Sequence, residues 1–178
     1  LINGPCEKIL SHTADGFIQK YATIIQRNAD KLNTLIQELI EFRRIETGNK
    51  PLEVQPVPLT EITRNMAETF SDIAETKSID YKILLDTVPS WNTDLNCYSK
   101  IVNNLLSNAF KYTPDGGEIT LKLTYSAEQT EVVVSNTGKG IKAEDIPGIF
   151  DRYKILDDLE KTRKKGNFSR NGLGLAIC

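Results

Sequence analysis

The sequence predicts an α+β fold in which a helical hairpin precedes a domain of mixed helices and strands. Apolar residues recur at helical spacing from Phe17 to Phe42, whereas the runs at 119–125 and 131–135 alternate or are rich in β-branched residues. Between these regions, helical and strand-like patterns follow one another. The 178 residues, 39% of them hydrophobic, suffice for one modest core and an appendage.

The first 48 residues predict two helices separated by a polar stretch at 12–16. Asp15 is placed to cap the second helix. That helix carries an apolar stripe about thirty residues long, and Gly48 and Pro51 end it. Two such helices make too thin a core alone, whereas pairing with a second copy into a four-helix bundle would bury the stripe. The pattern therefore predicts a homodimer formed through the helical part.

The rest of the chain predicts a sequence of short elements joined by turns. In order they are a strand-like linker at 50–57, a helix at 58–77, a strand at 79–87, a helix at 95–112, hairpin strands at 119–125 and 131–135, a short helix near 143–148, a charged loop, and a glycine-rich helix start at 172–178.

Composition excludes several classes of protein. The net charge of -2 gives no reason to expect a nucleic-acid-binding face. The three cysteines lack CxxC spacing and are odd in number, which argues against a disulfide framework or zinc site and suits a reducing compartment. No signal peptide is visible in these residues, and no apolar run approaches the roughly 20 residues of a membrane span. Because Leu1 lies within a helical pattern, we expect a piece of something longer.

The segment NNLLSNAFKYT at 103–113 combines amide, cationic and aromatic side chains in a predicted helix. Four of them fall on or near one face: Asn104, Asn108, Lys111 and Tyr112. Neutral amide oxygens suit Mg²⁺, which keeps its waters and phosphates, and a lysine one turn on can bind phosphate oxygens. Chance asparagines on a polar face are the alternative, which is weak because asparagine is a mediocre helix former.

Two glycine-containing segments follow this helix. VVSNTGKGI at 133–141 is a strand that runs into a glycine loop, and such glycines let backbone approach a flat ligand closely. NGLGLAI at 171–177 places glycines at a helix start, where backbone N–H groups face phosphate. IFDRY at 149–153 and a charged stretch lie between them. Alone that stretch would be a solvated loop, but between phosphate-directed elements we interpret it as a nucleotide lid.

These four segments, in this order, closely resemble the catalytic ATP-binding domain of sensor histidine kinases, within the wider GHKL ATPase group. Residues 17–47 resemble the second helix of that family's dimerisation and phosphotransfer domain. The resemblance implies a two-layer α/β sandwich of the Bergerat type after a helical hairpin. It divides the chain into a partial phosphotransfer domain at 1–48 and a catalytic ATP-binding domain at 49–178. The sequence of these segments and the short loop also resemble those of large two-component sensors, often hybrids, of Bacteroides-type bacteria.

The resemblance implies ATP and Mg²⁺ as cofactors and gives each matching residue a role. Asn108 would bind Mg²⁺, Asn104 would support the phosphates and the water shell, and Lys111 would bind phosphate. The remaining roles are nucleotide contacts by Tyr112, adenine recognition by Asn136, passage under the base by Gly138 and Gly140, lid anchoring by Phe150 and Arg152, and the second glycine box by Gly172 and Gly174.

The resemblance also implies partners and a location. The kinase would form a homodimer and pass phosphate to a receiver domain of a response regulator. The chain would be the cytoplasmic portion of a membrane-anchored inner-membrane sensor.

The chain departs from the family at four places. The phosphoacceptor histidine should lie just before Leu1, and His12 lacks the expected context, so we favour a surface histidine over a phosphoacceptor. Asn136 replaces the adenine-reading aspartate, which should weaken recognition by ~1 kcal/mol without abolishing it. Arg170 stands where a glycine is usual and either adds a phosphate contact or restricts the lid. The closing strands of the family's sheet should lie beyond Cys178.

Two other functions stay open. A GHKL ATPase usually has a glutamate base where this chain has Asn104, and an amide cannot take a proton from water. A degenerate nucleotide-binding or dimerisation module without kinase activity is suggested by Asn136 and Arg170. We rank the histidine kinase core above both.

Overall fold

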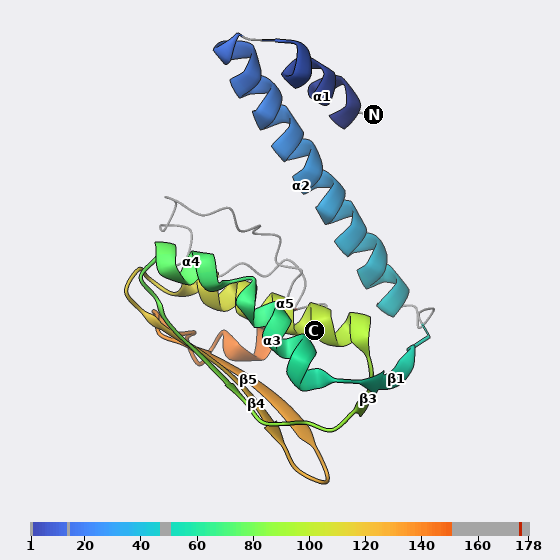
Figure 1. Ribbon diagram of the computed structural model, residues 1–178, viewed down its shortest axis with the longest axis vertical. Coiled ribbons are helices and arrows are strands. Elements are labelled where there is room, and N and C mark those ends of the chain that lie inside the picture. The colour runs from blue at the N-terminus through green and yellow to red at the C-terminus, as the bar shows by residue number, and fades with distance from the viewer. Residues whose placement is uncertain (1, 14, 47–50, 151–174, 176–178) are drawn as a thin grey trace. The chain divides into compact units, whose positions relative to one another are not determined.

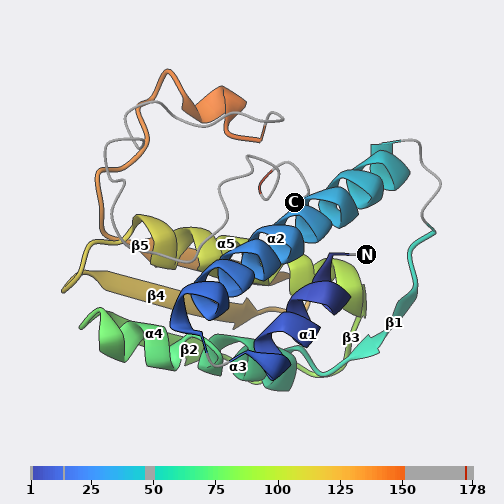
Figure 2. The same ribbon diagram turned by 90° about the horizontal axis from the view of Figure 1, so that it is seen from above.

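The computed structural model describes residues 2–13, 15–46, 51–150 and 175, and its elements are shown in two views in Figure 1 and Figure 2. The chain forms two compact units, Leu1–Lys50 and Pro51–Cys178. The first contains only helices in its described part, and the second combines helices with strands. The predicted α+β class is therefore confirmed.

The first unit is a hairpin of α1 (Asn3–His12) and α2 (Gly16–Glu46). As predicted, Asp15 caps α2, because its Oδ1 accepts from the backbone N–H of Phe17 at 2.8 Å and of Ile18 at 3.4 Å. The core between the helices is thin. Of the apolar side chains described in this hairpin, the buried ones are small, namely Cys6, Ala22 and Ala29.

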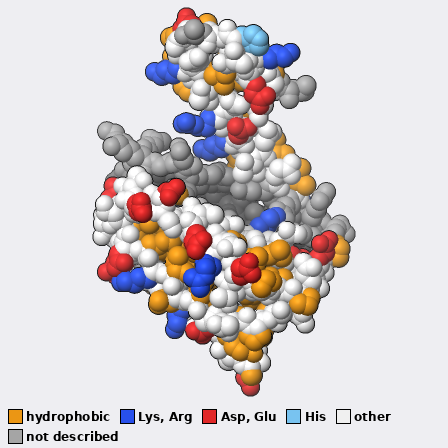
Figure 3. Space-filling model, in the orientation of Figure 1, with side chains coloured by type: hydrophobic (Ala, Val, Ile, Leu, Met, Phe, Trp, Pro, Cys, Tyr) orange, Lys and Arg blue, Asp and Glu red, His pale blue; other side chains and the backbone are white. Residues whose placement is uncertain are grey.

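Large apolar side chains of α2 lie at the surface instead, and apolar atoms are visible on this unit in Figure 3. Those at the surface include Phe17, Ile18, Tyr21, Ile24, Ile25, Leu32, Ile36, Leu39 and Ile40. The predicted stripe thus exists and is left uncovered within one copy of the unit.

The second unit is built on a three-stranded sheet of β2 (Asp80–Leu85), β4 (Glu118–Tyr125) and β5 (Thr130–Asn136), in the order β2-β4-β5. β2 and β4 are parallel, and β4 and β5 are antiparallel. Strands β1 (Val54–Val57) and β3 (Trp91–Asp94) form a separate antiparallel pair, with Val54 opposite Asp94.

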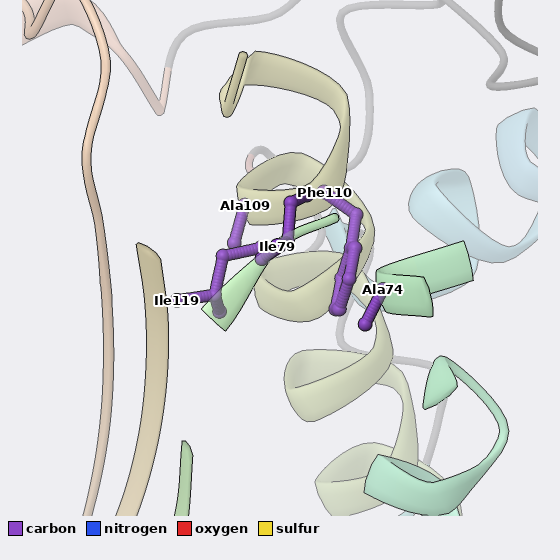
Figure 4. Close-up of a cluster of buried hydrophobic side chains, with 5 residues drawn as sticks. All are labelled: Ala74, Ile79, Ala109, Phe110 and Ile119. Carbon is purple, nitrogen blue, oxygen red and sulfur yellow. The ribbon is translucent and has the colours of Figure 1, made fainter. Parts of the chain in front are cut away.

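Helices α3 (Leu59–Glu68), α4 (Ser71–Thr76) and α5 (Leu95–Tyr112) cover one face of the sheet (Figure 2). Alternation along β4 explains the two layers, since Ile119, Leu121 and Leu123 are fully buried. Figure 4 shows one of the resulting core clusters, which consists of Ala74, Ile79, Ala109, Phe110 and Ile119. Around it, the Phe110 ring stacks on Phe70 and meets Tyr81 edge to face, with centroid distances of 5.1 Å and 5.0 Å.

Two sequence predictions need correction, and one strand was missed. The helix expected at 58–77 is two helices, α3 and α4. At their junction the Phe70 N–H donates to the Ala67 carbonyl at 3.1 Å, and the Thr69 hydroxyl donates to the Met66 carbonyl at 2.7 Å. The short helix near 143–148 is a 3-10 turn at Ile146–Gly148. Strand β3 was not predicted, since its sequence WNTD shows no apolar alternation. The helix at 95–112 is confirmed with its predicted bounds.

Candidate ATP-binding site

Helix α5 carries the candidate site and is fixed at its start by Asp94. The Asp94 carboxylate accepts from the backbone N–H of Cys97 at 3.0 Å and of Glu53 at 2.9 Å. These bonds hold the pKa of Asp94 below its usual range, since they favour the charged form. One side chain therefore caps α5 and ties the strand before it to the segment entering β1.

The inner face of α5 packs into the core. Val102, Leu106, Ala109 and Phe110 are buried there. Near the start of the helix, the Tyr98 hydroxyl bonds to Thr63 of α3, and burial raises the pKa of that tyrosine. These contacts set the rotation of α5 about its axis.

That rotation leaves the four predicted polar residues off the buried face. Asn104, Asn108 and Lys111 are half-buried, and Tyr112 is exposed. The Lys111 Nζ lies 4.9 Å from the centroid of the Tyr112 ring, within the range of a cation–π interaction. The helix therefore presents two amides, an ammonium group and an aromatic ring on adjoining positions.

The first glycine loop meets the last turn of α5. It starts at Asn136, the final residue of β5, which pairs with Ile119 in β4. A Cβ on Gly138 would stand 2.9 Å from the Tyr112 carbonyl oxygen, closer than side chains tolerate. Gly140 has φ of +69°, a conformation that favours glycine. The glycines thus let this loop run against the end of the helix that carries Lys111 and Tyr112.

Thr137 holds the start of this loop in place. Its hydroxyl accepts from the Glu118 backbone N–H at 2.9 Å, and its own N–H donates to the Glu118 carbonyl at 2.9 Å. Thr137 was not predicted to have this role, because its contact with a residue 19 positions away leaves no local signal in the sequence. Asp94 was also missed, although a helix predicted to begin at 95 would have pointed to the residue before it as a cap.

Helix α5 carries Asn104, Asn108, Lys111 and Tyr112. The loop after Asn136, with Gly138 and Gly140, meets this helix where Gly138 lies against the Tyr112 carbonyl. Phe150 is described and is 58% exposed. Arg152, Arg170, Gly172, Gly174 and most of the predicted lid lie outside the described residues.

His12 is exposed at the end of α1, with its Nδ1 2.9 Å from the Lys8 carbonyl and 2.8 Å from the Ser11 hydroxyl. This placement agrees with the preferred interpretation of a surface histidine. Among the helices that the structure describes, none has both the length and the apolar character needed to cross a bilayer.

Comparison with known proteins supports the resemblance to sensor histidine kinases. Residues 93–178 match the family model described as histidine kinase-, DNA gyrase B-, and HSP90-like ATPase. The chain is 33% identical over 184 residues to hybrid signal transduction histidine kinase D of Dictyostelium discoideum, covering 99% of this chain and 12% of that protein. It is also 33% identical over 181 residues to sensor histidine kinase TmoS of Ectopseudomonas mendocina, covering 99% of this chain and 18% of TmoS.

Solved structures show the same fold. The full-length ShkA structure in complex with AMPPNP superposes with a TM-score of 0.83 at 23% identity, over 99% of this chain and 36% of that one. The matching family model, these relatives and the arrangement of α5 with its glycine loop lead to one conclusion: the chain belongs to the sensor histidine kinase family and contains its catalytic ATP-binding domain.

Proposed function

We propose that this chain supplies the kinase core of a two-component sensor. The core binds Mg²⁺-ATP on the outer face of α5. The γ-phosphoryl group of ATP passes to a histidine outside these residues and then to an aspartate of a response regulator. The observation that carries the proposal is the meeting of the α5 polar face with the Gly138 loop at Tyr112. Phosphate-directed and ring-directed groups thereby share one surface.

Relatives support the binding and partner parts of the proposal. ShkA was crystallised with AMPPNP, and histidine kinase ThkA was crystallised in complex with the response regulator TrrA. The chain spans only 12% and 18% of the length of the two curated relatives described above. Activity and partners of the whole protein are therefore proposals drawn from this core.

The donor set on α5 fits magnesium. The described residues contain no group of three or more histidine, cysteine, aspartate or glutamate side chains that could cage a metal by themselves. Magnesium commonly binds through one or two protein oxygens and takes the rest from phosphates and water. The Asn108 amide oxygen would serve as that protein ligand, with Asn104 one turn earlier holding the surrounding waters. When bound, Mg²⁺ neutralises charge on the phosphate oxygens.

The residues themselves contribute positioning and charge. Lys111 would hold a phosphate oxygen, and the exposed Tyr112 ring would line the nucleotide beside the glycine loop. Because phosphoryl transfer needs little covalent chemistry from the protein, aligning ATP with the acceptor is the main task of such a site.

The same face disfavours ATP hydrolysis as the main activity. A hydrolase of this group needs a base to take a proton from water, and the Asn104 amide cannot do so. The remaining alternative is a nucleotide-binding module without kinase activity, which the neutral Asn136 at the adenine position would favour.

The helical unit completes the proposal. We assign residues 1–48 to the dimerisation and phosphotransfer domain and residues 49–178 to the catalytic domain. The apolar residues left exposed along α2 support a homodimer, since a second copy of the hairpin would bury them.

The test uses the full-length protein with γ-labelled ATP and Mg²⁺, with Asn108→Ala as the paired variant. We expect acid-labile, alkali-stable label on the unmodified protein, reduced at least about 100-fold in the variant because the metal ligand is lost. Measurable ATP binding without any label would reject the kinase in favour of the binding module. Release of inorganic phosphate without protein label would favour the ATPase.

A further inference from the structure

We propose that Lys77 is a positioning residue of the nucleotide site, which acts by binding carbonyl groups at the end of α5. This inference rests on the proposed function, because it concerns how the α5 face is kept ready for ATP. Lys77 directly follows α4 and precedes β2, so it is far from the asparagine segment in sequence. None of the motifs in the sequence includes it.

Lys77 bonds to the end of α5 through its side chain and to the following turn through its backbone. Lys77 is half-buried, and its ammonium group donates to the Phe110 carbonyl at 2.7 Å and makes a longer contact of 3.5 Å with the Thr113 carbonyl. Its own carbonyl accepts from the Gly116 N–H at 2.9 Å. Ser78, the next residue, adopts φ of +53°, so the chain turns sharply at this corner. Lys77 thus contacts both the last turn of α5 and the chain turn that follows it.

These contacts bear directly on phosphate binding. The carbonyls at the end of a helix carry partial negative charge, which repels an anion bound in the same turn. Lys111 lies in that last turn and is the proposed phosphate ligand. The Lys77 ammonium places a full positive charge on two of the terminal carbonyls, which offsets the repulsion. Lys111 is therefore left to attract phosphate without competition from the helix end.

The same contacts fix the geometry of the turn. The Ala109 carbonyl accepts from both the N–H and the hydroxyl of Thr113, at 2.9 Å and 2.7 Å. The Tyr112 carbonyl lies under Gly138 of the glycine loop. Lys77 bonds to the Phe110 carbonyl, which lies in sequence between Ala109 and Tyr112. Loss of its ammonium group would let the last turn fray where Lys111 and Tyr112 must stand.

The test measures ATP and adenosine affinity of the whole chain by titration calorimetry with Mg²⁺, for the unmodified chain and for Lys77→Met, Lys77→Arg and Lys82→Met. Lys82 is the matched control. It is an exposed lysine of the sheet, and its described ion pair is with Asp80 and not with α5. We expect Lys77→Met to weaken ATP binding about tenfold and adenosine binding about twofold, because the offset charge acts mainly on phosphate. Arginine should restore ATP affinity to within about twofold, and Lys82→Met should leave it unchanged.

A double-mutant cycle shows whether Lys77 acts through the last turn. In a Lys111→Met background, we expect Lys77→Met to weaken ATP binding less than about threefold. Equal losses for ATP and adenosine, an undiminished effect in that background, or equivalence of Lys77→Met and Lys82→Met would each overturn the proposal. If circular dichroism shows that Lys77→Met is unfolded, Lys77→Gln replaces it, with the same expectation and the same contrary outcomes. Failure of the unmodified chain to bind ATP would instead reject the proposed function, and the role of Lys77 with it.

Discussion

At the scale of single residues, we propose that Asn136 sets how well the site recognises adenine. Its Nδ2 donates to the Thr137 carbonyl at 3.1 Å, which occupies the donor side of the amide. The amide oxygen can then accept from an adenine amino group, as the aspartate of related kinases would. A neutral acceptor makes a weaker hydrogen bond than a charged one. On this proposal, an asparagine here binds adenine more weakly than an aspartate would, without losing recognition.

We predict that Asn136→Asp tightens ATP binding by no more than about fivefold, the equivalent of ~1 kcal/mol. The gain stays small because the carboxylate loses the bond to Thr137. Titration calorimetry with ATP and with an inosine nucleotide checks this, since only ATP offers the amino group. A rise from undetectable to tight binding would show that the natural site is crippled and would favour the non-enzymatic module.

At the scale of elements, α5 depends on support at both ends, and Asp94 provides it at the start. The carboxylate is needed in its charged form, because hydrogen bonds from Cys97 and Glu53 lower its pKa in the folded protein. A group with a lowered folded pKa stabilises the fold above its unfolded pKa of about 3.9 and loses that effect as pH falls through the folded value. The capping bonds should therefore weaken only in acid.

We predict that Asp94→Ala lowers the Tm by several degrees at pH 7 and that the deficit shrinks as the pH falls below about 4. Fluorescence of Trp91, the sole tryptophan, is a direct readout because it lies in β3 just before the cap. Asp80→Ala is the control, since Asp80 is exposed and pairs with Lys82 on the sheet. A deficit independent of pH would mean that the charge of Asp94 does not matter.

The elements also show how far the sequence could predict the structure. Helix α5 was predicted with its bounds because its apolar period, amide spacing and the following turn agree. The break between α3 and α4 was missed, since Met66, Phe70 and Ile73 continue a helical period across it. Strand β3 was missed because its partner β1 lies about 37 residues earlier and supplies the pairing that its own sequence does not specify.

The site was predicted unevenly for the same reason. Asn104, Asn108 and Lys111 form a local pattern that one helix displays, so the sequence identified them together. The support for that helix is non-local, since Lys77 reaches Phe110 across 33 positions and Thr137 reaches Glu118 across 19. Such contacts depend on how the elements are assembled, and single-residue patterns do not encode them.

At the scale of the whole molecule, the two units differ in how they are stabilised. The second unit has its own core, in which Phe110, Leu106 and the inner residues of β4 are fully buried. Among the side chains of the first unit that the structure describes, the buried apolar ones are Cys6, Ala22 and Ala29. Because the large apolar side chains of α2 are left exposed in one copy, we propose that a second copy of the hairpin covers them. Dimerisation should therefore belong to the first unit and nucleotide binding to the second.

We predict that the chain is a dimer whose association depends on the α2 stripe. Ile25→Glu combined with Leu32→Glu should yield monomer in analytical ultracentrifugation, because each change places a charge in a buried bundle core at a cost of several kcal/mol. Both residues are about half exposed in one copy, so the substitutions need not disturb the hairpin itself. Thr23→Glu combined with Thr34→Glu is the matched control, since it adds the same two charges on the opposite side of α2, where both threonines are exposed. The Ile25/Leu32 variant should keep its ATP affinity, because no residue of the nucleotide site lies in the first unit. A monomeric unmodified chain, or equal dissociation by the Thr23/Thr34 variant, would contradict the four-helix bundle.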